Sequence, residues 1–170
     1  MPLVEVKTEI RSDINTCFDI ATDIDLHKKS LKHTREIAIA GKTSGRITLG
    51  EWVSWEAIHF GLVQHLTSKI TNYDRPHFFV DEMVFGAFKS YRHEHIFWEE
   101  NNKTIMVNRF YFESPFGLFG KLSNVLVVKR YMKKLLLTRA EFLKKHAEKQ
   151  MSDKTKNKVK IIENTHVYEL

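Results

Sequence analysis

The stretch Thr104–Lys149, TIMVNRFYFESPFGLFGKLSNVLVVKRYMKKLLLTRAEFLKKHAEK, decides the fold because it changes from a strand pattern to a helix pattern. Its first ten residues are rich in aromatic and β-branched side chains and predict a strand. Ser114-Pro115-Phe116-Gly117 ends that strand, since proline cannot donate to a ladder and glycine permits a change of direction. From Phe119 to Lys149 a wide apolar stripe at helical spacing predicts a helix about 45 Å long, enough to cross a whole sheet.

Seven strands and two short helices are expected in front of this helix. Ser12 or Asp13 is expected to cap the first short helix, and Asp23 or Asp25 the second, which ends near Leu31. The short spacers between most strands imply antiparallel hairpins. The expected strands are Leu3–Ile10, Arg35–Ala40, Glu51–Phe60, Leu62–Asn72, His77–Phe85, Phe88–Trp98 and Thr104–Glu113.

This order of elements predicts an α+β domain with one antiparallel sheet. A twisted sheet of about seven strands tends to curl, so the long helix can lie across its concave side. A helix cannot fill a strongly curved concavity to normal packing density, and a cavity between the two is therefore expected. We assign residues 1–149 to this domain and residues 150–170 to a polar C-terminal tail, in which Val159, Ile161 and Val167 could add a short strand.

Length and composition exclude several classes of protein. The 170 residues suit one domain, and 42% hydrophobic residues are enough to bury a core. With Cys17 as the single cysteine, no intrachain disulfide is possible, and the opening residues lack the basic segment and apolar run of a signal peptide. A cytoplasmic protein is predicted. No uncharged apolar stretch approaches the roughly 20 residues that span a bilayer, and no cofactor is predicted.

The net charge of +6 is concentrated in the predicted long helix. Residues 119–149 carry a net charge of +7, whereas residues 1–118 carry −2. A solvated polar helix face explains this excess and is the favoured interpretation, but the same face could contact an anionic membrane or an acidic partner. No recognition motif for sequence-specific nucleic-acid binding is present, and a monomer or weak dimer is expected. The basic residues in question are Lys129, Arg130, Lys133, Lys134, Lys144 and Lys145.

Two histidines are predicted to point the same way from one strand. The alternation of Phe88–Trp98 places Tyr91, His93, His95 and Phe97 on one face. With Asp81 on the preceding strand they could form a metal site. We favour a hydrogen-bonded polar cluster that braces the sheet or meets a ligand's polar end, and predict no metal. Exposed residues without a shared role are the remaining alternative.

Several short motifs between residues 2 and 145 resemble a known superfamily. They are Val53-Ser54-Trp55, His59-Phe60-Gly61, Leu66–Ile70, Pro76–Asp81, Gly86-Ala87-Phe88, Tyr91–Phe97 and Ser114–Gly120. This pattern is similar to the START-like proteins of the helix-grip (SRPBCC, polyketide cyclase) superfamily, which includes lipid-transfer domains, polyketide cyclases and plant allergen-type carriers. Within it, the chain looks like a bacterial group of stand-alone proteins, some of them labelled as cell division proteins. Asn108 stands where that group usually has aspartate, and Tyr91 where it usually has tryptophan.

The resemblance and the residue pattern together favour a binding or carrier module for a hydrophobic small molecule or lipid. The alternative is a cyclase- or hydrolase-like enzyme with His93 or His95 as acid or base. Cys17, on a helix face expected to be buried, is interpreted as structural. The residues predicted to contact the ligand are Trp55, His59, Phe79, Asp81, His93, His95, Phe97, Asn108, Phe110, Phe112, Met132 and Leu136.

Overall fold

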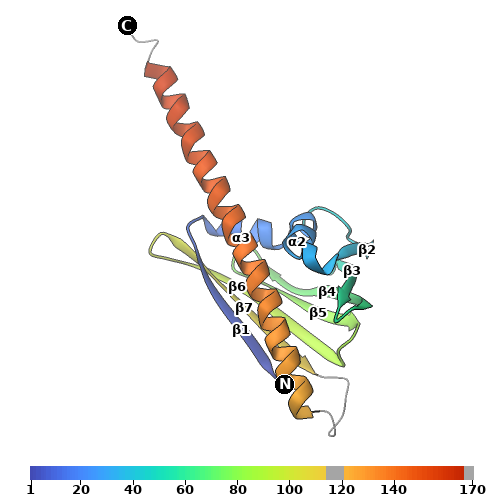
Figure 1. The fold of residues 1–170 in the computed structure, drawn as a ribbon. Helices are drawn as coiled ribbons and strands as arrows, with labels where there is room; N and C mark the ends of the chain where they lie inside the picture. Colours follow the sequence, from blue (N-terminus) through green and yellow to red (C-terminus); the bar gives the residue numbers. More distant parts are fainter. Residues whose placement is uncertain (114–120, 167–170) are drawn as a thin grey trace.

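A seven-stranded antiparallel sheet packs against one long C-terminal helix (Figure 1), as the sequence predicts. The computed structural model describes residues 1–113 and 121–166, with side chains from 121–124 and 158–166 left aside. The strand order is β1-β7-β6-β5-β4-β3-β2, so that the first and last strands are neighbours. The strands are β1 (Leu3–Ile10), β2 (Ile37–Gly41), β3 (Trp52–His59), β4 (Leu62–Asp74), β5 (Phe78–Phe85), β6 (Ser90–Glu100) and β7 (Lys103–Glu113).

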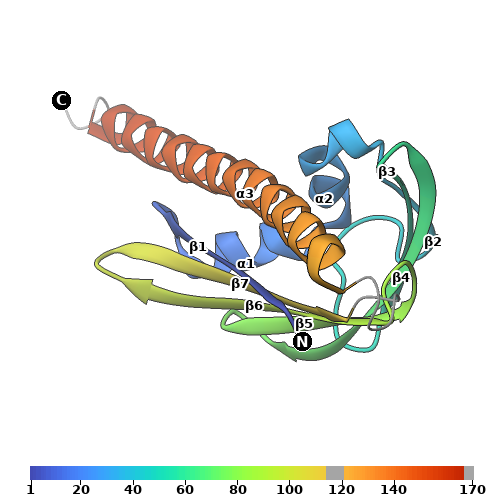
Figure 2. The same ribbon diagram turned by 60° about the horizontal axis from the view of Figure 1, so that its bottom comes forward.

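The sheet curves toward the helix (Figure 2). The pairing of β4 with β5 shifts twice, leaving Val84 and Thr71 as extra residues. Such bulges bend a strand and increase its twist, which gives the sheet its concave face. Alternation decides what faces the concavity: Val4, Val6 and Ile10 of β1 are buried, whereas the residues between them are more exposed.

Two short helices, α1 (Ile14–Ala21) and α2 (Ile24–Ser30), follow β1 and are capped by aspartates. Asp13 and Asp23 accept from the backbone N–H groups of Thr16 and Leu26, at 2.8 and 2.9 Å, which decides between the capping residues expected from the sequence. A 3-10 turn, η1 (Lys32–Thr34), comes next. Cys17 is buried as expected, and burial raises the pKa of its thiol to about 11, so it is not a reactive thiolate.

The long helix, α3 (Lys121–His166), extends farther than the sequence analysis predicts. Its middle part buries Leu136, Ala140, Leu143 and Ala147 against the rest of the domain. Residues 150–166 continue the helix beyond the sheet (Figure 1), so the short strand suggested for Val159 and Ile161 is wrong. No glycine or proline interrupts this stretch, which explains why the helix goes on. Val167 lies outside the described residues. In the described part of the chain, no helix is long and apolar enough to span a membrane.

Candidate functional site

A cavity of about 510 Å³ lies between α3, α2 and the concave face of the sheet. Its wall is mostly apolar, with aromatic rings from the sheet facing aliphatic side chains of the two helices. The expected gap between helix and sheet is therefore present. Among the residues that line it are Ile24, Leu31, Trp55, Phe79, Phe88, Phe110, Phe112, Met132, Leu135 and Leu136.

Most of the predicted ligand contacts lie in the cavity wall. Those that line it are Trp55, His59, Phe79, Asp81, His93, Phe110, Phe112, Met132 and Leu136. His95, Phe97 and Asn108 do not line it, although all three are buried. Phe79 stacks on the ring of His95 with 4.0 Å between centroids, and Phe97 packs on Phe18 of α1 at 5.5 Å. Phe79, which lines the cavity, therefore lies over His95.

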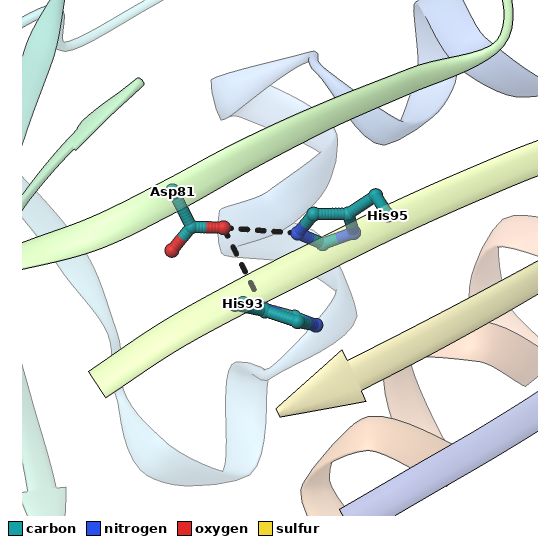
Figure 3. A group of neighbouring side chains, drawn as sticks. All are labelled: Asp81, His93 and His95. Atoms are coloured by element: carbon teal, nitrogen blue, oxygen red, sulfur yellow. Dashed lines mark hydrogen bonds and ion pairs between the residues drawn. The ribbon is translucent and has the colours of Figure 1, made fainter. Parts of the chain in front are cut away.

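Asp81 of β5 joins His93 and His95 of β6 in a buried cluster (Figure 3). Its Oδ1 lies 2.9 Å from Nε2 of His95 and 3.5 Å from Nδ1 of His93. The hydroxyl of Tyr91 donates to Oδ2 at 2.9 Å. Burial lowers the pKa of both histidines well below the usual value, so both rings are neutral at pH 7. Neutral His95 therefore carries its proton on Nε2 and donates it to Asp81, which agrees with a hydrogen-bonded polar cluster.

The same three residues have a donor set that can hold a metal ion, with ligand atoms all within 4.8 Å of one another. The surroundings of His93 fit this less well. A metal at Nδ1 would place the ring proton on Nε2, and Nε2 is buried without a hydrogen-bond partner among the described residues. Metal-bound histidines normally donate their second N–H to a carboxylate, carbonyl or water. The cluster is better explained by its internal hydrogen bonds.

A second polar group faces the cavity, and the sequence analysis misses it. Nε2 of His27, on α2, lies 3.0 Å from Oε1 of Glu36, and the His27 ring stacks on Trp55 with 4.5 Å between centroids. Burial lowers the pKa of His27, and the nearby Arg139 lowers it further. Burial alone would raise the pKa of Glu36, but His27 and Arg139 outweigh it and hold that pKa below its usual value. Glu36 is therefore an ionised acceptor that receives a hydrogen bond from neutral His27.

Arg139 of α3 brings a positive charge to the same cavity. Burial lowers its pKa, while Asp81 and Glu36 act in the opposite direction, and a guanidinium stays protonated in proteins. Its Nη2 donates to the carbonyl of Ala21 at 3.1 Å, and Arg139 forms no ion pair with a described residue. Because a guanidinium has five N–H donors, Arg139 has donor capacity left for a ligand.

Arg139 stands at a position whose burial can be predicted from the sequence. It lies three and four residues after Leu136 and Leu135, which puts it on the buried stripe of the helix. The many basic residues around Arg139 hide this pattern, because the net charge of the helix does not distinguish a buried cation from an exposed one.

His59 also lines the cavity, next to the exposed Phe60. Its Nδ1 lies 2.7 Å from the hydroxyl of Tyr131 on α3, and burial lowers its pKa. The neighbouring Phe60 packs on the Tyr131 ring with 4.5 Å between centroids. These contacts connect the β3–β4 turn to the helix.

Known structures share this architecture at low sequence identity. The protein TTHA0849 from Thermus thermophilus is 20% identical, with a TM-score of 0.66 over 84% of this chain and 97% of that one. A START superfamily protein from Mycobacterium smegmatis is 12% identical, with a TM-score of 0.67 over 87% and 98%. The ginseng major latex-like protein 151 from Panax ginseng is 14% identical, with a TM-score of 0.63 over 86% and 97%. This chain has the helix-grip fold. Its sequence matches no protein-family model and no curated protein.

Proposed function

We propose that this protein binds or carries a hydrophobic small molecule or lipid in the cavity between the sheet and α3. The observation that carries the proposal is the apolar cavity of about 510 Å³, which lies within the usual range of roughly 300–1,000 Å³ for ligand pockets. Burial of apolar ligand surface would supply the affinity, at about 25 cal/mol per Å² before ordering costs. The helix-grip fold, shared with a START superfamily protein, supports the same function.

The polar end of the ligand is proposed to be a hydrogen-bond acceptor. Asp81 and Glu36 already accept from their own neighbours, whereas Arg139 has donors to spare. With the histidines neutral, the two carboxylates outnumber the single guanidinium, so a further full negative charge is unfavourable there. An uncharged carbonyl, as in a ketone or an ester, fits this environment better than a carboxylate.

Ligand binding can be tested with a cavity-filling variant and a matched control. Met132→Trp adds a large ring to the cavity wall, and Leu137→Trp adds the same ring to the exposed side of the same helix. Extraction of the purified protein for mass spectrometry should identify a co-purified apolar molecule. A fluorescent fatty-acid methyl ester should bind the native chain and Leu137→Trp but not Met132→Trp. If neither the native chain nor Leu137→Trp takes up any apolar probe, the proposal is wrong.

The enzyme alternative depends on a histidine that can exchange a proton with the ligand. His95 does not line the cavity, and its Nε2 is engaged by Asp81, which leaves His93 as the better candidate for acid–base chemistry. A cyclase or hydrolase of this kind predicts turnover that disappears in His93→Gln while the fold survives. Turnover that persists in this variant would reject the assignment.

Other features stay predictions from the sequence alone. The absence of a disulfide framework favours a cytoplasmic location. A monomer or weak dimer stays the expected oligomeric state. A role in cell division rests only on the resemblance of the motifs.

A further inference from the structure

The cavity opens between apolar side chains that are exposed to solvent. Phe60 in the β3–β4 turn is 62% exposed and Val127 on α3 is 55% exposed, yet both line the cavity. They therefore mark its opening. Leu62, which is 66% exposed, pairs with His59 of the cavity wall across the β3–β4 turn, and Leu126, which is 59% exposed, precedes Val127 on α3. Exposed apolar residues thus come from two separate segments, the β3–β4 turn and α3. We call them the mouth surface: Phe60, Leu62, Leu126 and Val127.

The helix beside this opening is basic without any acidic residue to balance it. Val127, Arg130, Tyr131 and Lys134 follow each other at positions i, i+3, i+4 and i+7, so the two cations continue the stripe that begins at the opening. Both are exposed, and neither forms an ion pair with a residue that the structure describes. From Lys121 onward the first acidic residue is Glu141. The positive charge of this part of α3 is therefore not cancelled by acidic residues of the helix itself.

We infer that the mouth surface docks onto an anionic lipid bilayer and that the apolar cargo enters the cavity there. This inference rests on the proposed function and specifies its partner. Aromatic and aliphatic side chains at turn tips enter the interfacial region of a bilayer, while adjacent Lys and Arg attract acidic headgroups. Burial of the mouth surface in lipid also removes its exposed apolar side chains from water.

A lipid surface explains the combination of exposed apolar residues with neighbouring cations better than an acidic protein does. The cations alone would suit either an anionic membrane or an acidic protein. A helix face that is merely solvated would have no reason to lie beside exposed apolar residues. Here Phe60 and Val127 are exposed and also line an apolar cavity, and a bilayer is the medium in which an apolar cargo is dissolved. The cargo would then pass from lipid to cavity without crossing water.

Two pairs of substitutions test the two components of the surface. Arg130→Gln/Lys134→Gln removes charge, and its control Lys145→Gln/Lys149→Gln removes the same charge farther along the helix. Leu62→Ser/Leu126→Ser removes apolar contact, and its control Ile39→Ser/Leu49→Ser does so at exposed residues elsewhere. None of these residues lines the cavity. Co-sedimentation is measured with phosphatidylcholine vesicles, with and without phosphatidylglycerol, at low and high salt.

We expect the native chain to bind the phosphatidylglycerol vesicles, more weakly at high salt. At about fivefold per cation, the charge pair should lower the affinity roughly 25-fold, and the apolar pair should lower it by more than about tenfold. Both controls should bind as the native chain does. Absence of native binding, or an equal loss in the controls, would overturn the inference.

A vesicle-free titration with the fatty-acid methyl ester separates this inference from the proposed function. If the ester binds all five proteins equally while the charge pair and the apolar pair fail on vesicles, the docking surface and the cavity are both supported. If no protein binds the ester, the proposed function fails, and the vesicle data still decide the docking surface. Native binding to an acidic polypeptide such as polyglutamate, without binding to vesicles, would assign the surface to a protein partner and reject the lipid.

Discussion

The two buried polar clusters of this protein differ in the kind of group that is left without a partner. Asp81 receives hydrogen bonds from Tyr91 and His95, but Nε2 of His93 has no partner among the described residues. The cluster of His27, Glu36 and Arg139 leaves charged guanidinium donors at the cavity surface. A charged donor forms stronger hydrogen bonds than a neutral imidazole, so we expect the guanidinium to contribute more to ligand binding. The cluster that the sequence makes conspicuous has more of its hydrogen bonds inside the wall.

Removal of the Asp81 carboxylate should lower the stability of the fold more than any other substitution discussed below. In Asp81→Ala, the Nε2–H of His95 and the hydroxyl of Tyr91 lose their acceptor while both residues stay buried. At about 1–3 kcal/mol for each unsatisfied buried donor, the free energy of unfolding should fall by about 4 kcal/mol. Urea denaturation measures it. Asp81→Asn keeps one acceptor oxygen, so its free energy of unfolding should fall by less. Equal stability of Asp81→Ala and the native chain would contradict the role of Asp81 in bracing the sheet.

The largest part of the pH dependence of stability near pH 6 should come from the same cluster, because the pKa of His93 and His95 is lowered more than that of His27 or His59. Because the pKa of His93 and His95 is lowered in the folded state, the unfolded chain binds protons more readily below about pH 6.5. Stability is therefore fully present above that pH and is lost as the pH falls from there. The two histidines together should cost about 3 kcal/mol between pH 7.5 and pH 5.5.

Urea denaturation at both pH values measures this difference. His93→Gln/His95→Gln should flatten the pH dependence, even though it lowers stability at pH 7.5. His65→Gln, on the exposed part of β4, serves as the matched control. An unchanged slope in the double variant would show that other groups cause the acid sensitivity.

Removal of the Arg139 side chain should affect the ligand more than the fold. Arg139→Met keeps a long apolar stem and removes the donors, so the fatty-acid methyl ester should bind about 20-fold more weakly, as expected for about 1.5–3 kcal/mol per charge-assisted hydrogen bond. Lys145→Met, on the exposed part of the same helix, should bind normally. Equal ester affinity in Arg139→Met and the native chain would show that the guanidinium does not contact the ligand.

The sequence predicts the fold well because its strongest signals are local. Alternation, capping aspartates and the Ser114-Pro115 boundary each depend on neighbours in the chain, and together they determine the element order. The Asp81 cluster was also predictable, since an alternating strand places His93 and His95 on one side. Glu36 and His27 meet only through tertiary packing, so neither has a local signal that marks it as part of a site. The continuation of α3 as far as His166 is not predicted, because the polar composition of residues 150–166 is also typical of a tail, although no glycine or proline in this stretch breaks a helix.

The smallest predicted effect concerns the charge of the second cluster. Glu36→Gln keeps an oxygen that can accept from His27 but removes one of the two carboxylates near Arg139. A free fatty acid should then bind about fivefold more tightly than to the native chain, about 1 kcal/mol for a partly screened like-charge contact, while its methyl ester binds unchanged. Competition of both compounds against one fluorescent probe measures the ratio. Glu82→Gln, on the same sheet but outside the cavity lining, controls for net charge. If ester and acid respond alike to Glu36→Gln, the excess of carboxylates does not select for an uncharged polar end.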